Sequence, residues 1–81
     1  MIIRTKTYGD DFEIRKIEMQ ENLFLTVEVF KVAEGYKSFA HDNTVHHYNL
    51  EGYGVHGEKE KSVNLAVHDL EEIIREYEDH A

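Results

Sequence analysis

Histidine is the residue type in this chain with the clearest capacity for metal chemistry, because the 81 residues include six histidines and no cysteine. Neutral imidazoles bind Zn²⁺ or Ni²⁺, and His41, His46 and His47 lie close together in the sequence. Adjacent residues of a strand point to opposite faces, so at most one of His46 and His47 can join His41 across a hairpin. These three histidines are therefore weak candidates for a metal site, and we expect no cofactor.

The glycines of residues 52–57, Gly-Tyr-Gly-Val-His-Gly, match the G-x-G-x-x-G pattern of dinucleotide-binding loops. In those loops a strand precedes the glycines and an apolar-periodic helix follows them at once, so that its N-terminus meets the pyrophosphate. Here the charged residues 58–61 follow instead. We interpret residues 51–61 as a glycine-rich loop or a ragged hairpin tip, with the motif as a flexible glycine loop, and expect no nucleotide site there.

Residues suited to catalysis are also few. The chain has two serines, Ser38 and Ser62, and neither lies in the pattern of a nucleophile elbow. His41 and Asp42 could act together as a general acid and base, but neighbouring strand residues diverge. A sheet with a single helix also leaves little room for the deep pocket of a small-molecule site. We therefore expect a protein that is not an enzyme and takes no small-molecule substrate.

Acidic charge distinguishes this chain from an average domain, because 17 Asp and Glu residues exceed 9 Lys and Arg residues and give a net charge of -8. Such a charge repels nucleic acid. Acids at the C-terminal end of a helix oppose its dipole, each by roughly 0.3 kcal/mol, so their presence there indicates a use for the charge. The acids expected to bind a partner are Glu71, Glu72, Glu76, Glu78, Asp79, Asp10 and Asp11. The alternative is a solvated surface that only keeps the chain soluble.

The elements that must position these residues follow from the hydrophobic spacing. Alternating apolar residues, interrupted by Gly, Asn or Asp, predict a β-meander through the first two thirds of the chain. The predicted strands cover residues 1–8, 11–19, 23–32, 36–41, 44–50 and 61–65. Gly9 supplies the positive φ that a tight type II′ turn requires, and a change of phase in the second strand predicts a β-bulge near Arg15 and Lys16.

A C-terminal amphipathic helix is predicted over 67–79, where apolar residues take helical spacing. Its apolar stripe consists of Val67, Leu70, Ile73, Ile74 and Tyr77. Residues 61–66 allow two interpretations, because Val63 and Leu65 alternate like a strand while Val63 also continues the helical stripe. The expected fold is a single α+β domain over 1–81, an antiparallel meander of about five to six strands with this helix packed on one face.

The sheet face that this helix cannot reach is a second candidate surface. Phe24 and Phe30 project from the third strand on that side, while Leu25 and Val27 point toward the helix. Exposed aromatics in one row usually mark contact with another protein. We therefore expect self-association through Phe24 and Phe30.

The leading functional hypothesis is an acidic protein-binding module that docks on a basic protein partner. An inhibitor of the phage- or mobile-element type, which presents DNA-like negative charge, is one form of it. The alternatives are a structural homo-oligomeric domain, with a homodimer as its simplest case, and a small histidine-based metal-binding or catalytic domain. The N-terminus lacks the apolar run of a signal peptide and no stretch is apolar enough to span a membrane, so a cytoplasmic location without membrane contact is expected.

Overall fold

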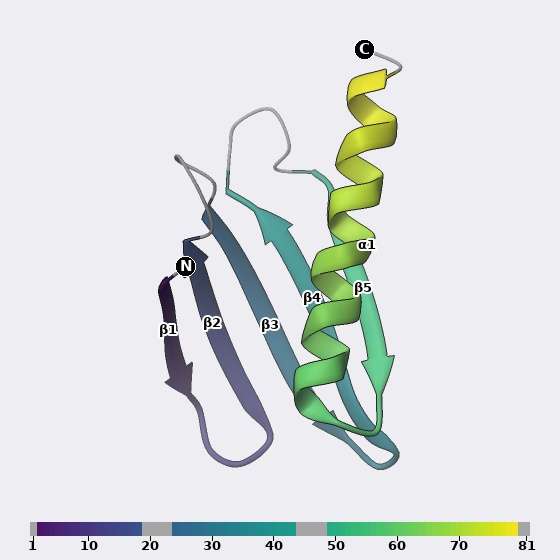
Figure 1. Cartoon of the computed structure of the whole chain (residues 1–81). Coiled ribbons are helices and arrows are strands. Elements are labelled where there is room, and N and C mark those ends of the chain that lie inside the picture. The colour runs from purple at the N-terminus through teal and green to yellow at the C-terminus, as the bar shows by residue number, and fades with distance from the viewer. Residues whose placement is uncertain (1, 19–23, 44–48, 80–81) are drawn as a thin grey trace.

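Five antiparallel strands and one helix make up the fold in the computed structural model, which describes residues 2–18, 24–43 and 49–79. The elements are β1 (Ile2–Thr7), β2 (Phe12–Glu18), β3 (Phe24–Val32), β4 (Gly35–Asp42), β5 (Glu51–His56) and α1 (Lys59–Asp79). The strands form one sheet in the order β1-β2-β3-β4-β5, and the helix lies across one face of it (Figure 1). The predicted α+β meander with a C-terminal helix is confirmed.

Glycines with positive φ shape two of the hairpins. Gly9 has a φ of 74°, and the amide of Tyr8 donates a hydrogen bond to the carbonyl of Phe12 at 2.8 Å. The loop between β1 and β2 therefore has three residues, 9–11, and is not the predicted two-residue turn, although the positive φ of Gly9 is confirmed. Gly35, with a φ of 140°, pairs with Val32 and leaves a two-residue loop between β3 and β4.

The predicted β-bulge in β2 is wrong. This strand pairs with β1 and with β3 without interruption, so its side chains alternate strictly between the two faces. Phe12 and Ile14 point away from α1, whereas Glu13, Arg15 and Ile17 share the face on which the helix lies. The change of phase that suggested a bulge arises because two charged residues occupy helix-side positions, where charged residues on α1 pair with them.

The sequence-based assignment is also wrong between residues 51 and 65. β5 replaces the predicted loop, and residues 61–65 belong to α1 instead of forming a strand. In α1, Val63 and Leu70 are buried at helical spacing, whereas Leu65 is 45% exposed, so the helical period prevails over the alternation of Val63 and Leu65. Of the strand predicted over 44–50, residues 44–48 lie outside the described residues, and the last two are not in a strand.

The hydrophobic core lies between α1 and the middle of the sheet. The helix packs mainly against β5 and β4 and makes a smaller contact with β3. The buried apolar residues are Ile17, Leu25, Val27, Val29, Ala40, Val63, Ala66 and Leu70. Several of the residues that meet across the helix–sheet contact are small, which lets α1 approach the strands closely.

The helix is longer than the strand on which it lies. Its 21 residues span about 31 Å at 1.5 Å per residue, whereas the six residues of β5 span about 20 Å. Figure 1 shows the last turns of α1 extending beyond the edge of the sheet at which β5 begins. Leu70 is fully buried over the sheet, but Tyr77, the last residue of the predicted apolar stripe, is 48% exposed because the sheet ends before it.

Candidate interaction surfaces

The paired glycines of β5 position α1 against the sheet. A Cβ atom on Gly52 would lie 2.5 Å from the backbone nitrogen of Leu70, and one on Gly54 would lie 2.6 Å from that of Ala66. Both distances are below the 3.0 Å that real Cβ atoms essentially always keep. The G-x-G pattern therefore allows close packing of a helix on a strand, and the predicted flexible loop is wrong.

The two serines of the chain meet inside this contact. The Oγ atoms of Ser38 on β4 and Ser62 on α1 lie 2.8 Å apart, and both residues are fully buried. Ser62 donates its hydroxyl proton to the carbonyl oxygen of Lys59 at 2.7 Å, so Ser38 is the donor to Ser62. Both hydroxyl groups are satisfied within the core and are closed to a substrate.

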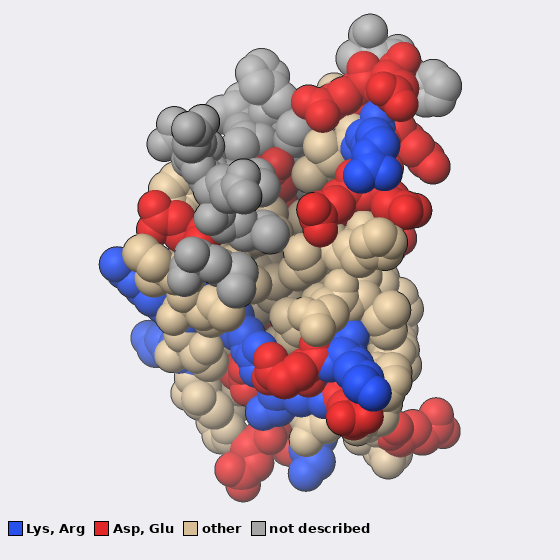
Figure 2. All heavy atoms as spheres, viewed as in Figure 1, with Lys and Arg blue, Asp and Glu red and all other residues tan. Residues whose placement is uncertain are grey.

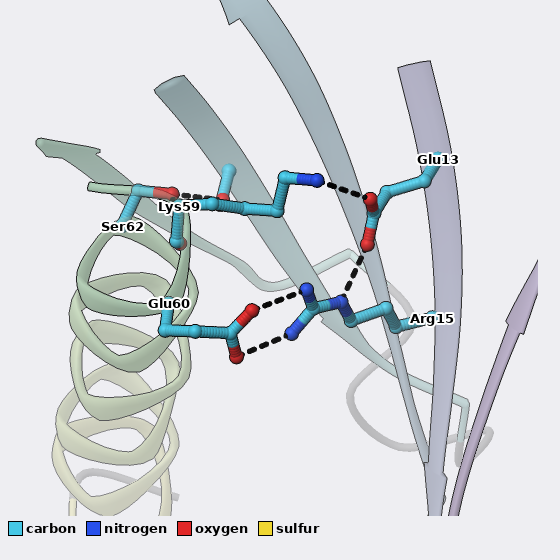
Figure 3. A network of polar contacts seen from close by, with 6 residues as sticks. Glu13, Arg15, Lys59, Glu60 and Ser62 are labelled. Carbon is cyan, nitrogen blue, oxygen red and sulfur yellow. Dashed lines mark hydrogen bonds and ion pairs between the residues drawn. The ribbon is translucent and has the colours of Figure 1, made fainter. Parts of the chain in front are cut away.

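Four charged side chains join β2 to the first turn of α1 (Figure 3). The carboxylate of Glu13 accepts hydrogen bonds from Arg15 Nε at 2.6 Å and from Lys59 Nζ at 2.9 Å. The guanidinium of Arg15 also donates to both carboxylate oxygens of Glu60, at 2.8 and 2.5 Å. Glu13 is only 7% exposed, so its carboxylate is shielded from water, whereas the side chain of Glu60 is 70% exposed. The ionic network ties the start of the helix to β2.

The ionic network holds its members in their charged forms. Burial desolvates the Glu13 carboxylate and acts to raise its pKa, but the hydrogen bonds and charges of Arg15 and Lys59 outweigh burial and lower that pKa below its ordinary value. The pKa of Glu60 is lowered chiefly by the hydrogen bond from Arg15. The same hydrogen bond is the main reason why the pKa of Arg15 is raised.

The seven acids predicted to bind a partner lie at two ends of the molecule. Asp10 and Asp11 belong to the loop between β1 and β2, which is at the opposite end of the sheet from the C-terminus of α1 (Figure 1). The other five are exposed on the second half of the helix, which we call the acidic half of α1: Glu71, Glu72, Glu76, Glu78 and Asp79. Figure 2 shows carboxylates gathered there around one basic side chain. The structure therefore splits the predicted acidic surface.

Neighbouring charges on α1 have partners within the chain. Asp69 Oδ2 accepts a hydrogen bond from the backbone amide of Tyr53 at 2.9 Å, which satisfies a donor on the outer edge of the sheet. His68 Nε2 lies 3.3 Å from the carboxylate of Glu72, one turn further along the helix. Asp69 therefore helps to hold β5 against the helix.

The predicted histidine cluster is only partly described. His46 and His47 lie outside the described residues. His41 Nε2 lies 3.2 Å from a carboxylate oxygen of Glu28 on β3 and 3.4 Å from one of Glu51 on β5. Within residues 2–18, 24–43 and 49–79, no three His, Cys, Asp or Glu side chains are grouped so that they could hold a metal ion. His41 therefore brings two carboxylates together on the sheet surface.

The sheet face away from α1, which we call the open face, carries the predicted residues Phe24 and Phe30. Phe24 is 44% exposed, and Phe30 is half-buried because it stacks on Phe12 with ring centroids 4.7 Å apart. This stack is one of four ring contacts that cross the sheet. The aromatic row consists of Tyr8, Phe12, Phe30, Phe39 and Tyr53.

Sequence reasoning found one member of the aromatic row and missed the other four. The centroids of successive rings are 5.6, 4.7, 5.8 and 5.0 Å apart, and the two outer rings, Tyr8 and Tyr53, remain almost half exposed. An outward aromatic residue on each strand was the available signal. Strand register then decides which of these rings meet, and the register depends on turn lengths that hydrophobic alternation does not determine.

Two surfaces of the described structure thus stand out, the open face with its aromatic row and the acidic half of α1. No helix among the described residues is both long and apolar enough to cross a lipid bilayer. Comparison with protein-family models, with curated proteins and with solved structures gives no match for this chain.

Proposed function

We propose that this chain is a non-enzymatic protein-interaction module that docks its partner on the open face of the sheet. The observation that carries this proposal is the aromatic row, five rings in successive contact from one side of the sheet to the other. Contiguous exposed apolar surface usually marks an interaction site, and aromatic residues are enriched where such sites are fully buried.

The roles of the polar groups support binding rather than catalysis. The buried serine pair joins β4 to α1, and the ionic network around Glu13 joins β2 to α1. The glycine motif permits helix packing. The serines and the glycine motif, which suggested chemistry in the sequence, thus have structural tasks, whereas the aromatic row has none that requires its outer rings to be exposed.

A second candidate function is docking of the acidic half of α1 on a basic protein, including inhibition by DNA-like charge. It is favoured by the exposure of all five acids and by the lack of a basic residue in the last turn of the helix. Contacts of this kind are steered by charge and weaken steeply as salt increases.

Capture experiments with two variants test which surface is used. The immobilised chain is exposed to an extract of the cells that encode it, at about 0.05 M and about 0.5 M salt. Phe24→Thr with Tyr53→Thr removes exposed aromatic surface, and Glu71→Gln with Glu72→Gln and Glu76→Gln removes acidic charge. We expect the aromatic variant to lose at least about 90% of the captured partner at either salt concentration, because aromatic anchors dominate binding energy.

The charge variant is the matched control and should retain that partner. If the aromatic variant retained the captured partner, and the partner were lost in the charge variant and at high salt, docking on the open face would be contradicted and the second candidate supported. Every substituted side chain is exposed, so both variants should fold. Circular dichroism of both variants checks that a loss of capture does not reflect unfolding.

A further inference from the structure

We propose that the occupant of the open face is a second copy of this chain, related by a two-fold axis that runs parallel to the strands near β3. This inference rests on the proposed function, because it names the partner of the same surface. In such a pair the two sheets face each other, with β1 of one copy opposite β5 of the other.

The charge of the open face suits a copy of itself. The chain carries a net charge of -8, but the open face holds four basic and three acidic side chains, a balance of one positive charge. These side chains are Arg4, Lys6, Lys16, Lys37, Glu18, Glu28 and Glu51. A strongly acidic or strongly basic partner would meet charges of its own sign on part of this face, whereas a nearly neutral face can meet its own copy.

The charges of the open face are also unevenly distributed. Arg4, Lys6 and Lys16 lie on β1 and β2, and we call them the cationic patch. Arg4 is directly opposite Lys16 in the sheet, an arrangement of like charges that destabilises a strand pair. Among the described residues none of the three forms an ion pair. The cationic patch therefore lacks carboxylates that another molecule could supply.

A second copy holds the complementary carboxylates at the other side of the same face. The register places Arg4, Lys16, Thr26, His41 and Glu51 in one row across the five strands. His41 lies between Glu28 and Glu51, within 3.2 and 3.4 Å of their carboxylates. A two-fold axis along β3 places this row opposite the same row of the second copy, in reversed strand order. Arg4 of each copy therefore faces Glu51 of the other, and Lys16 faces His41.

The apolar side chains fit the same arrangement. Phe30 lies on the central strand and would meet Phe30 of the second copy. Lys6, whose Nζ lies 5.4 Å from the ring centroid of Tyr8 in its own chain, shares a row with Tyr53 and would also lie over Tyr53 of the second copy, where a cation is attracted to the ring. An axis perpendicular to the strands would instead place β1 against β1 and bring the two cationic patches together. The axis parallel to the strands brings one like-charge pair together, Glu28 with Glu28 of the second copy, whereas the perpendicular axis brings together all the cations of the two patches. Charge thus favours the axis parallel to the strands.

The open face is just large enough for a specific pair. Five strands about 4.8 Å apart and six residues long at about 3.3 Å per residue cover roughly 480 Å². Two copies would therefore bury roughly 1,000 Å², which is close to the lower limit for a specific interface. An interface of this size needs well-placed contacts at its centre and edges, which the ring of Phe30 and the pairing of Arg4 with Glu51 would provide.

Charge reversal at Arg4 and Glu51 tests both the second copy and the axis. Arg4→Glu alone would place acid against acid twice in the pair, and Glu51→Arg alone would place base against base twice. We expect sedimentation to show a dimer for the wild type and a Kd raised about 10-fold to 100-fold for each single variant. An equimolar mixture of the two variants should restore the dimer, because both contacts then join Glu to Arg.

The control is Lys31→Glu, which reverses an exposed charge on the other face of β3 and should leave the dimer intact. A monomeric wild type would overturn the second copy as occupant, and a mixture that stays monomeric would overturn the axis. If the wild type bound a single-stranded oligothymidine and Arg4→Glu abolished that binding, the second copy would also be overturned as occupant, in favour of nucleic acid. If the wild type is monomeric but the aromatic variant still loses its captured partner, only this inference fails and the proposed function stands.

Discussion

Gly54→Ala should push α1 away from β5 and lower the free energy of unfolding by about 3 kcal/mol, at the upper end of the cost of overpacking a core. The added Cβ would lie 2.6 Å from the backbone nitrogen of Ala66 and 2.8 Å from the Cβ of Leu65. Because backbone atoms cannot rotate aside as the end of a side chain can, the whole helix must shift. Equilibrium unfolding in urea, followed by circular dichroism, measures the loss.

Gly57→Ala is the matched control for this substitution. Gly57 lies between β5 and α1, no atom is within 4 Å of a Cβ built there, and its φ is not in the left-handed region. Its replacement should change the free energy of unfolding by less than about 0.5 kcal/mol. If Gly54→Ala were equally harmless, α1 would not be seated directly on the backbone of β5.

Glu13→Gln should destabilise the fold by about 3 kcal/mol at neutral pH, because it removes the negative charge that Arg15 and Lys59 share. The amide keeps the shape of the side chain, so the loss reports on charge and hydrogen bonding rather than on a cavity. Arg15 retains Glu60 as a partner, whereas Lys59 loses its carboxylate. Urea titration of the variant beside the wild type measures the difference.

The same network predicts how acid destabilises the wild type. The pKa values of Glu13 and Glu60 are lowered in the folded chain from an ordinary value of 4.5. Their contribution to stability is therefore complete above that value and is lost as the pH falls below it through the folded pKa. We expect the stability of Glu13→Gln to fall less steeply over this range than that of the wild type.

Glu18→Gln provides the control, since Glu18 is an exposed acid on the same strand. This variant should keep the stability of the wild type at neutral pH within about 0.5 kcal/mol and should keep its acid sensitivity. Equal acid sensitivity in Glu13→Gln and the wild type would show that protonation of Glu13 does not contribute to acid unfolding.

Strand faces proved easier to predict than the glycine-rich segment. In β3 the alternation of Leu25 and Val27 with outward Phe24 assigned each side chain to its correct face, because period-two spacing needs no knowledge of other strands. β5 also alternates, but its inward residues are Gly52 and Gly54, while Tyr53 and Val55 point outward. The hydrophobic pattern of this strand is thus inverted, because the helix lies too close for any inward side chain.

For the candidate surfaces, the sequence predicts the face on which a residue lies within its own strand or helix, but not which residues of different elements meet. The face of Phe30 follows from its own strand, but its contact with Phe12 depends on the three-residue loop at 9–11. Asp10 and Asp11 were grouped with the acids of α1 on the basis of charge alone. Their separation in space follows from strand direction, which brings the loop after β1 to the end of the sheet where the helix begins.

The close seating of α1 on β5 also supplies a signature by which distant relatives can be recognised. Gly52 and Gly54 meet a helix whose facing residues are Ser62, Ala66 and Leu70, spaced four apart. This contact limits the size of the side chains at the two glycine positions and at the Ser and Ala positions, rather than their polarity. The signature is G-x-G, followed after seven residues by S-x-x-x-A-x-x-x-L, in which the Ser and the Ala are replaced only by other small residues. We expect a sequence with this signature to share the fold even where every outward residue has diverged.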